Sequence, residues 1–254
     1  MARAKAASSK KIDARLALIL AAERHFALHG FEGTPLSVIH NAAGQKNASA
    51  THYHFGSRNG LIEAILEYRM APLNERRAER MVELDGLSGT HDLRSLMVAW
   101  IMPLAEELQY RPEGNHYLRF LDRLRRGPSK PFAERIMSLQ SEYRHLLDLI
   151  DQQLSHVPPR IRQSRLGIAA EQIVSALAAL EADLPTSGPD HPYPALAINS
   201  LIDYITGGLG AGCHPETEAL ALHPSQIDFH FRISNETHED SGSQNAAATG
   251  MDRS

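Results

Sequence analysis

Apolar side chains recur along most of this chain at intervals of three and four residues, and no stretch shows the apolar-polar alternation that is typical of strands. The pattern predicts an all-α protein. A first helix is expected from Lys10 to His29, because Gly30 is well suited to stop it there. The positions that step round this helix are Ile12, Leu16, Ile19, Leu20, Glu23 and Phe26.

Turn and capping residues divide the rest of the pattern into further helices. Thr34 and Pro35 are expected to open a second, short helix that stops near Gly44, with the threonine hydroxyl as its cap. Ser57 caps a long fourth helix, and Pro72 inside that helix should kink it. A third short helix is expected from 47 or 49 to 55, and the others cover 58–84, 90–109, 112–126, 131–157, 159–184 and 195–211.

Composition narrows the class of protein. With 254 residues and 43% hydrophobic content, the chain can bury a sizeable core in one large or two smaller domains. Cys213 is the single cysteine, so a disulfide framework and a cysteine-based zinc cluster are excluded, and we expect a cytoplasmic protein. No apolar run approaches the ~18 residues that a membrane span needs, so we expect no membrane partner.

Charge is distributed unevenly along the chain. Residues 1–80 carry 12 Lys and Arg against 7 Asp and Glu, a net of +5, whereas residues 81–254 carry 14 against 23, a net of −9. A basic segment beside an acidic body suits a protein of which only one part approaches a polyanion. The alternative is that charge drifts by a few units in any chain.

Short helices with a tight turn at Gly44, followed by a long helix, have the form of a helix-turn-helix DNA-binding unit on a helical body. The segments LALILAAERHFALHGFEGTPLSVI (16–39), AAG (42–44) and HYHFGSRNGLIEAIL (52–66) share one composite pattern. That pattern is A-x-x-x-F-x-x-x-G-[FY]-x-x-T, then A-G, then Y-x-H-F-x-S-[KR]-x-x-L. On these residues the chain resembles the TetR family of bacterial transcriptional regulators.

The resemblance implies a division into domains. Residues 10–57 would form a three-helix helix-turn-helix domain, completed by the start of helix 58–84, and residues 58–213 a larger helical domain for ligand binding and dimerisation. Composition adds a flexible basic N-terminus at 1–9 and a mostly disordered tail at 214–254, because the tail is rich in Ser, Asn, Gly and Ala.

The resemblance also implies contacts with the phosphates of double-stranded DNA, at Thr34, His52, Tyr53, His54 and Arg58. Helix N-termini favour anions, which suits the first and last of these without any family knowledge. Base edges would be read after Gly44, since amides pair with adenine, lysine with guanine, and an alanine methyl meets a thymine methyl. The candidates are Gln45, Lys46, Asn47, Ser49 and Ala50, each of which has a plainer alternative as a turn residue or cap.

Three departures from the family pattern qualify these contacts. The segment from Gly44 to Phe55 is one residue longer than usual, so the register of the base-reading residues is open. His52 stands where tyrosine is usual and titrates near pH 6.5, which predicts mild acid dependence of DNA binding. His40 replaces a small residue, so either the helices splay or the imidazole points outward.

The histidines raise the possibility of a metal or catalytic site. His25 and His29 lie four residues apart on one helix face, as zinc ligands often do. No carboxylate or third histidine completes the set at a recognisable spacing, and no catalytic triad, phosphate loop or dinucleotide motif is present. We therefore expect no metal, no cofactor and no enzymatic activity, with a helical enzyme as the remote alternative.

The body is expected to hold a small-molecule effector of unknown identity. Pro103 should bend its helix and leave space, and large mixed side chains gather in this part of the chain. The candidate ligand contacts are Trp100, His116, Phe120, Tyr143 and Leu147. Each of them is also a reasonable core residue.

The last two long helices carry apolar stripes, and in the family such helices form the homodimer interface. The candidates are Ile173, Leu177, Leu180, Leu201 and Ile205; the alternative is that they face the core of their own subunit. Together these features predict a repressor that binds a palindromic operator as a homodimer and is released by a mostly apolar ligand. A transcriptional activator of the same fold is the alternative.

Overall fold

A computed structural model describes residues 2–45, 53–86, 91–109, 114–126, 141–184 and 193–222, with the backbone alone at 2–13 and 141–143. All elements in these ranges are helices, so the predicted all-α class is confirmed there. The helices are α1 (Ala2–His29), α2 (Leu36–Ala42), α4 (Arg58–Gly86), α5 (Leu93–Ala105), the 3-10 helix η1 (Glu106–Leu108), α6 (Tyr117–Arg126), α8 (Ser141–Gln153), α9 (Pro159–Asp183), α10 (Ala195–Gly210) and α11 (Pro215–Ala221).

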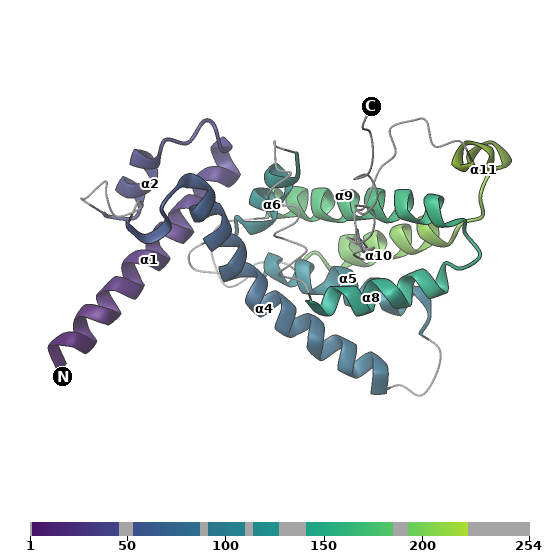
Figure 1. The fold of residues 1–254 in the computed structure, drawn as a ribbon, viewed down its shortest axis with the longest axis horizontal. Coiled ribbons are helices and arrows are strands. Elements are labelled where there is room, and N and C mark those ends of the chain that lie inside the picture. The colour runs from purple at the N-terminus through teal and green to yellow at the C-terminus, as the bar shows by residue number, and fades with distance from the viewer. Residues whose placement is uncertain are drawn as a thin grey trace, which may run out of the picture.

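The first helices form a small unit at one end of the molecule (Figure 1). We call α1, α2, residues 53–55 and the first two turns of α4 the N-terminal unit. Its core consists of fully buried apolar side chains, among them Leu18, Ala22, Phe26, Ile39 and Leu61. Gly30 has φ +78°, and its N–H donates to the carbonyl of Phe26, so α1 ends at the residue that the sequence indicates.

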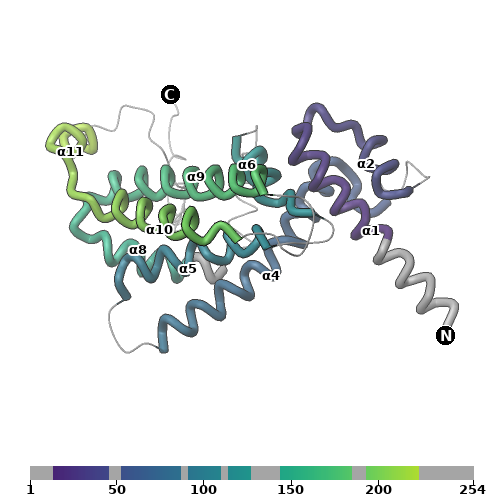
Figure 2. Tube along the Cα trace, turned by 180° about the vertical axis from the view of Figure 1, so that it is seen from behind, coloured from purple at the N-terminus to yellow at the C-terminus, as the bar shows by residue number. Residues whose placement is uncertain are grey.

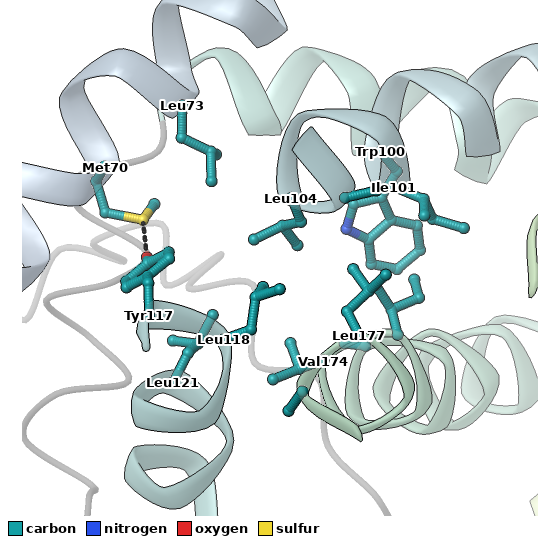
Figure 3. Packing of buried hydrophobic residues seen from close by; sticks show 14 of the residues in the cluster. Met70, Leu73, Trp100, Ile101, Leu104, Tyr117, Leu118, Leu121, Val174 and Leu177 are labelled. Atoms are coloured by element: carbon teal, nitrogen blue, oxygen red, sulfur yellow. Dashed lines mark hydrogen bonds between the residues drawn. The ribbon is translucent and has the colours of Figure 1, made fainter. Parts of the chain in front are cut away.

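The remaining helices form a larger bundle, which we call the body, and α4 runs from the N-terminal unit along its side (Figure 2). Helices α9 and α10 lie side by side in both views. Close-packed side chains from α4, α5, α6 and α9 fill the interior, where the Tyr117 hydroxyl lies 3.1 Å from the sulfur of Met70 (Figure 3). Burial raises the pKa of this tyrosine, so it is a neutral member of the core.

Several boundaries differ from the sequence prediction. Helix α1 begins at Ala2 rather than at Lys10. The body helix predicted from residue 90 begins at Leu93, because the carboxylate of Asp92 accepts the N–H of Ser95 as an N-cap. Hydrogen bonds to Ser95 lower the pKa of that carboxyl. The predicted tail starts with a helix, α11, which Arg160 holds by donating to the carbonyl of Ala221.

Some predictions fall outside the described residues. They are the third helix up to residue 52, the segment 131–140 of the helix predicted from 131 to 157, and the tail from 223 onward. Within the described ranges, no helix is long and apolar enough to cross a membrane.

Candidate nucleic-acid interface

An aromatic edge precedes α4 on the N-terminal unit. Residues 53–55 are helical, and the Tyr53 side chain is 70% exposed. The ring of His54 meets the ring of Tyr53 edge-on at 5.2 Å and that of Phe55 at 5.9 Å between centroids. Phe55 packs against the core, and the guanidinium of Arg15 lies 5.3 Å from its ring centroid. The core-facing Phe55 thus positions an outward-facing tyrosine and a half-buried histidine.

The start of α4 is fixed beside this edge. The Ser57 hydroxyl accepts the N–H of Gly60 at 3.0 Å, which confirms the predicted cap. Arg58 donates to the carbonyl of Phe31, so it ties the first turn of α4 to the loop after α1. Its guanidinium has further N–H donors, which leaves it able to contact an anion as well.

Thr34 lies elsewhere than expected. Its side chain is 1% exposed, and its hydroxyl donates to the carbonyls of Gly30 at 2.8 Å and His25 at 3.3 Å. The cap position of α2 is occupied by Pro35, with no side-chain cap. The predictions that Thr34 caps α2 and touches a phosphate are therefore wrong for its side chain, which closes the C-terminal turn of α1 instead.

Few of the base-reading candidates fall within the described residues. Gln45 is described, and its side-chain amide lies 3.4 Å from the carbonyl of Ala43. Lys46, Asn47, Ser49, Ala50 and His52 lie outside the described ranges. Their register and their contacts stay predictions. His40 is 5% exposed, so of the two alternatives predicted for this position the outward-pointing imidazole is wrong.

The histidine pair on α1 does not form a metal site with other described residues. The rings of His25 and His29 lie 5.6 Å apart, and burial, followed by the charges of His29 and Arg24, lowers the pKa of His25. In the described part of the chain, no group of three or more histidine, cysteine or carboxylate side chains is placed to hold a metal ion.

A buried ion cluster joins the N-terminal unit to the body. Arg69 on α4 donates to both carboxylate oxygens of Glu23 on α1, at 2.6 and 2.7 Å. The same guanidinium lies 3.7 Å from the carboxylate of Glu107 on η1, and all three side chains are 2–3% exposed. Burial acts to lower the pKa of Arg69, but the hydrogen bonds and charge of Glu23 and the charge of Glu107 outweigh it and raise the pKa.

The cluster continues along α4 as a series of alternating charges. Arg76 donates to Glu107 at 2.5 Å and lies 3.1 Å from Glu106, which also binds Arg80. These arginines follow Arg69 by seven and eleven residues and so share one face of α4. Sequence reasoning missed this cluster, because the charges it joins are 26 to 46 positions apart.

Helix α6 provides a second connection between the two parts. Arg123 donates to the carbonyls of Ala27 at 2.6 Å and Leu28 at 3.2 Å, in the last turn of α1. Beside this contact, the ring of Phe120 lies 6.5 Å from that of Phe26 and 5.8 Å from that of Phe31. The body therefore supplies partners for the end of α1.

The opposite end of α6 is held by α9. The buried carboxylate of Glu181 accepts the N–H groups of Leu118 and Arg119 at 3.0 Å each, and the Arg119 side chain also donates to it. Burial raises the pKa of Glu181, although these hydrogen bonds oppose the shift. Helix α6 thus bridges α9 and the N-terminal unit.

Three of the candidate ligand residues, Trp100, Phe120 and Leu147, are buried in the common hydrophobic core. Trp100 and Leu147 are each 2% exposed in the apolar core, and Trp100 packs near Leu177 of α9 (Figure 3). Phe120 is fully buried at the junction of α6 with α1. The side chain of Tyr143 lies outside the description. A pocket that these residues share stays a prediction.

His116 precedes α6 and is 9% exposed. Burial, followed by the charge of Arg119, lowers its pKa to about 4, so the imidazole is neutral at pH 7. Arg119 lies 2.9 Å from Nδ1 and can only donate, so the proton of the neutral ring is assigned to Nε2.

The predicted dimer residues are divided between core and surface. Ile173, Leu177 and Ile205 are at most 2% exposed within the subunit, so a partner subunit has no surface to cover there. Leu180 and Leu201 are partly buried against the core. The prediction is thus corrected for the first three, since an apolar stripe on a helix does not reveal which neighbour covers it.

Comparison with known proteins gives matches in structure but none in sequence. No protein-family profile and no curated protein matches this sequence. A TetR family transcription regulator from Marinobacter aquaeolei VT8 aligns over 77% of this chain and 97% of its own, at 21% identity and a TM-score of 0.49. The TetR family regulator PfmR from Thermus thermophilus aligns over 78% of this chain and 99% of its own, at 17% identity and a TM-score of 0.44.

Proposed function

We propose that this protein is a DNA-binding transcriptional regulator of the TetR type, with its DNA contacts on the N-terminal unit. The observation that carries the proposal is the aromatic edge: the motif residue Tyr53 is 70% exposed, although the adjoining Phe55 is anchored in the core. An exposed tyrosine that holds no core position suits a phosphate contact. His54 and Arg58 adjoin it, and His52 precedes it in the chain.

The base contacts come from residues 45–50, which precede this edge. A helix that enters the major groove presents the side chains of its first turns to the bases, while its flanks meet the phosphates. Gln45, Lys46 and Asn47 supply the amide and ammonium donors, and Ser49 and Ala50 the smaller contacts. Thr34 is left out of the proposed phosphate contacts, because its hydroxyl donates to a carbonyl at the end of α1.

The protein acts as a homodimer through the outer face of α9 and α10. Large apolar side chains are exposed there: Ile168 at 40%, Tyr204 at 64% and Leu196 at 83%. Gly207 and Gly208 leave open space at the same face of α10, since an added Cβ would meet nothing within 4 Å. Exposed apolar side chains beside glycines permit close approach of a second copy. Two N-terminal units would then reach half-sites about 34 Å apart.

A dimerisation experiment tests this face. Leu196→Arg with Tyr204→Arg places two charges on it, and analytical ultracentrifugation should show monomers at concentrations where the wild-type protein is a dimer. Leu222→Arg is the matched control, because Leu222 is 78% exposed but lies just beyond α11. A dimer that persists in the double variant would place the interface elsewhere.

A small, mostly apolar effector bound in the body is proposed to release the DNA. The ion cluster around Arg69 and the contacts of α6 join body and N-terminal unit, so a ligand that favours another arrangement of the body shifts the separation of the two units. The bound protein represses if its operator overlaps a promoter, and the ligand then relieves the repression. Mapping the operator relative to the promoter distinguishes a repressor from an activator.

The DNA contact is tested by selection and titration. Duplexes are recovered from a random pool with the purified protein, and the affinity of Tyr53→Ala for the selected duplex is measured by gel shift over a range of salt concentrations. We expect weaker binding with an unchanged salt dependence, because a neutral tyrosine hydroxyl that donates to a phosphate displaces no counterion. Val82→Ala is the control, since Val82 is equally exposed, at 72%, on α4. A pool without any enriched sequence would refute the proposed function.

A further inference from the structure

The face of α1 that packs on the rest of the N-terminal unit leads to a basic residue toward the start of the helix. Its buried positions Phe26, Ala22 and Leu18 recur at intervals of four residues, and the next turn brings Arg15, which is exposed. Lys11 precedes Arg15 by four residues in the sequence.

Arg15 lies directly beside the aromatic edge. Its guanidinium stands 5.3 Å from the ring centroid of Phe55, and that ring is the neighbour of His54 and, through it, of Tyr53. A duplex that contacts Tyr53 therefore passes close to Arg15 on α1. The preceding turns of α1 extend from this point for roughly 20 Å, at 1.5 Å per residue back to Ala2.

The charge of these turns is one-sided. Before Arg15 the chain carries Arg3, Lys5, Lys10 and Lys11, against a single acidic residue, Asp13. In a chain whose residues 81–254 carry a net charge of −9, this concentration of positive charge lies beside the surface proposed to meet phosphates. A strongly acidic ligand is the chemistry that fits it.

We propose that the first turns of α1, up to Arg15, bind the phosphate backbone of duplex DNA that flanks the half-site. This inference rests on the proposed function, because it needs the duplex to lie along the Tyr53 edge. The base-reading residues select the half-site, and the start of α1 adds a contact that does not depend on sequence. The footprint of each subunit is therefore longer than the half-site itself.

The contact has a defined dependence on salt. Each phosphate that a lysine or arginine neutralises contributes about 0.9 to the slope of log affinity against log salt concentration. If two of the four charges before Arg15 pair with phosphates in each subunit, flanking DNA steepens the slope by about two per subunit. At 0.1 M salt, flanking DNA should therefore raise the affinity by a factor of about ten or more.

The experiment compares two lengths of one selected operator. The short duplex ends at the outer edges of the half-sites, and the long duplex adds ten base pairs of arbitrary sequence on each side. The neutral variant is Arg3→Gln, Lys5→Gln, Lys10→Gln and Lys11→Gln together. The charge-retaining control replaces each of these residues with the other basic type: Arg3→Lys, Lys5→Arg, Lys10→Arg and Lys11→Arg.

We expect the wild-type protein and the charge-retaining control to bind the long duplex at least tenfold more tightly than the short one. The neutral variant should bind both with the affinity that the wild type has for the short duplex, which also shows that it is folded. Equal affinity of the wild type for both lengths, or a neutral variant that keeps the gain, would overturn the inference and leave the proposed function standing. Failure of the wild type to bind any duplex would overturn both.

Discussion

The ion cluster that joins α1 to α4 allows a quantitative prediction. Replacing Glu23 with leucine removes both hydrogen bonds of Arg69 to the carboxylate and leaves a guanidinium that is 3% exposed. The remaining partner, Glu107, lies 3.7 Å away and so offsets only part of the loss. Because a buried charge without its partner cannot regain water, the folded state should be strongly destabilised.

The magnitude follows from the two bonds. A hydrogen bond to a charged group contributes about 1.5–3 kcal/mol, and breaking a buried ion pair costs about 3–5 kcal/mol. With Glu107 still present, we expect Glu23→Leu to lower the free energy of unfolding by about 3 kcal/mol. For a chain of this size that corresponds to a fall in Tm of about 6–12 °C.

Urea denaturation followed by circular dichroism at fixed protein concentration measures this change. Arg69→Met should cost a similar amount, because it leaves the carboxylate of Glu23 buried, whereas Glu107 keeps Arg76 at 2.5 Å. The double variant Glu23→Leu with Arg69→Met should have a free energy of unfolding near that of the wild type or close to that of one single variant. The reason is that both charges of the pair are then absent.

The coupling energy between Glu23 and Arg69 in this double-mutant cycle should be at least about 2 kcal/mol. Single variants that each cost less than about 1 kcal/mol would show that the pair is solvated in solution. Additive single effects would show that Glu23 and Arg69 act independently, and either result would refute the account of the cluster given above.

Three further predictions concern single positions. The pKa of His116 is lowered from 6.5 to about 4, so between these pH values the unfolded chain binds a proton that the folded chain does not. The free energy of unfolding should therefore fall as the pH falls from 6.5 to 4. Urea titrations of His116→Gln should show a flatter fall. An unchanged pH profile would contradict this. Gly30→Ala should cost about 1–2 kcal/mol of unfolding free energy because φ is +78°, whereas Gly86→Ala, which adds a Cβ in open space, should not. Ser57→Ala should cost about 1 kcal/mol in the same assay, through loss of the bond to the N–H of Gly60, and Ser57→Asp should retain most of it.

Local sequence signals predicted some of the helix ends correctly. Gly30 ends α1 and Ser57 caps α4, as their side chains and dihedral preferences indicate. The start of α9 at Pro159 follows from the fixed φ of proline at a first helical position. Each of these is decided within a few residues, so the sequence carries the information directly.

Features that depend on partners far along the chain were not predictable in this way. The hydroxyl of Thr34 could cap α2 or donate to the end of α1, and only the fold shows that it donates to the end of α1. The stripe that includes Ile173 and Leu177 had two possible neighbours, of which the subunit's own core is one. No local pattern pairs Glu23 with Arg69, because burial of both depends on how α1 and α4 pack.

The contact of Arg123 with the last turn of α1 bears on how far this protein is modular. The carbonyls of Ala27 and Leu28 receive their hydrogen bonds from a side chain that lies almost a hundred positions later. A chimera that fuses the first helices to the body of another protein would leave those carbonyls without that donor unless the recipient supplies an arginine at the equivalent place. The unit of exchange in domain shuffling is therefore the N-terminal unit together with α6.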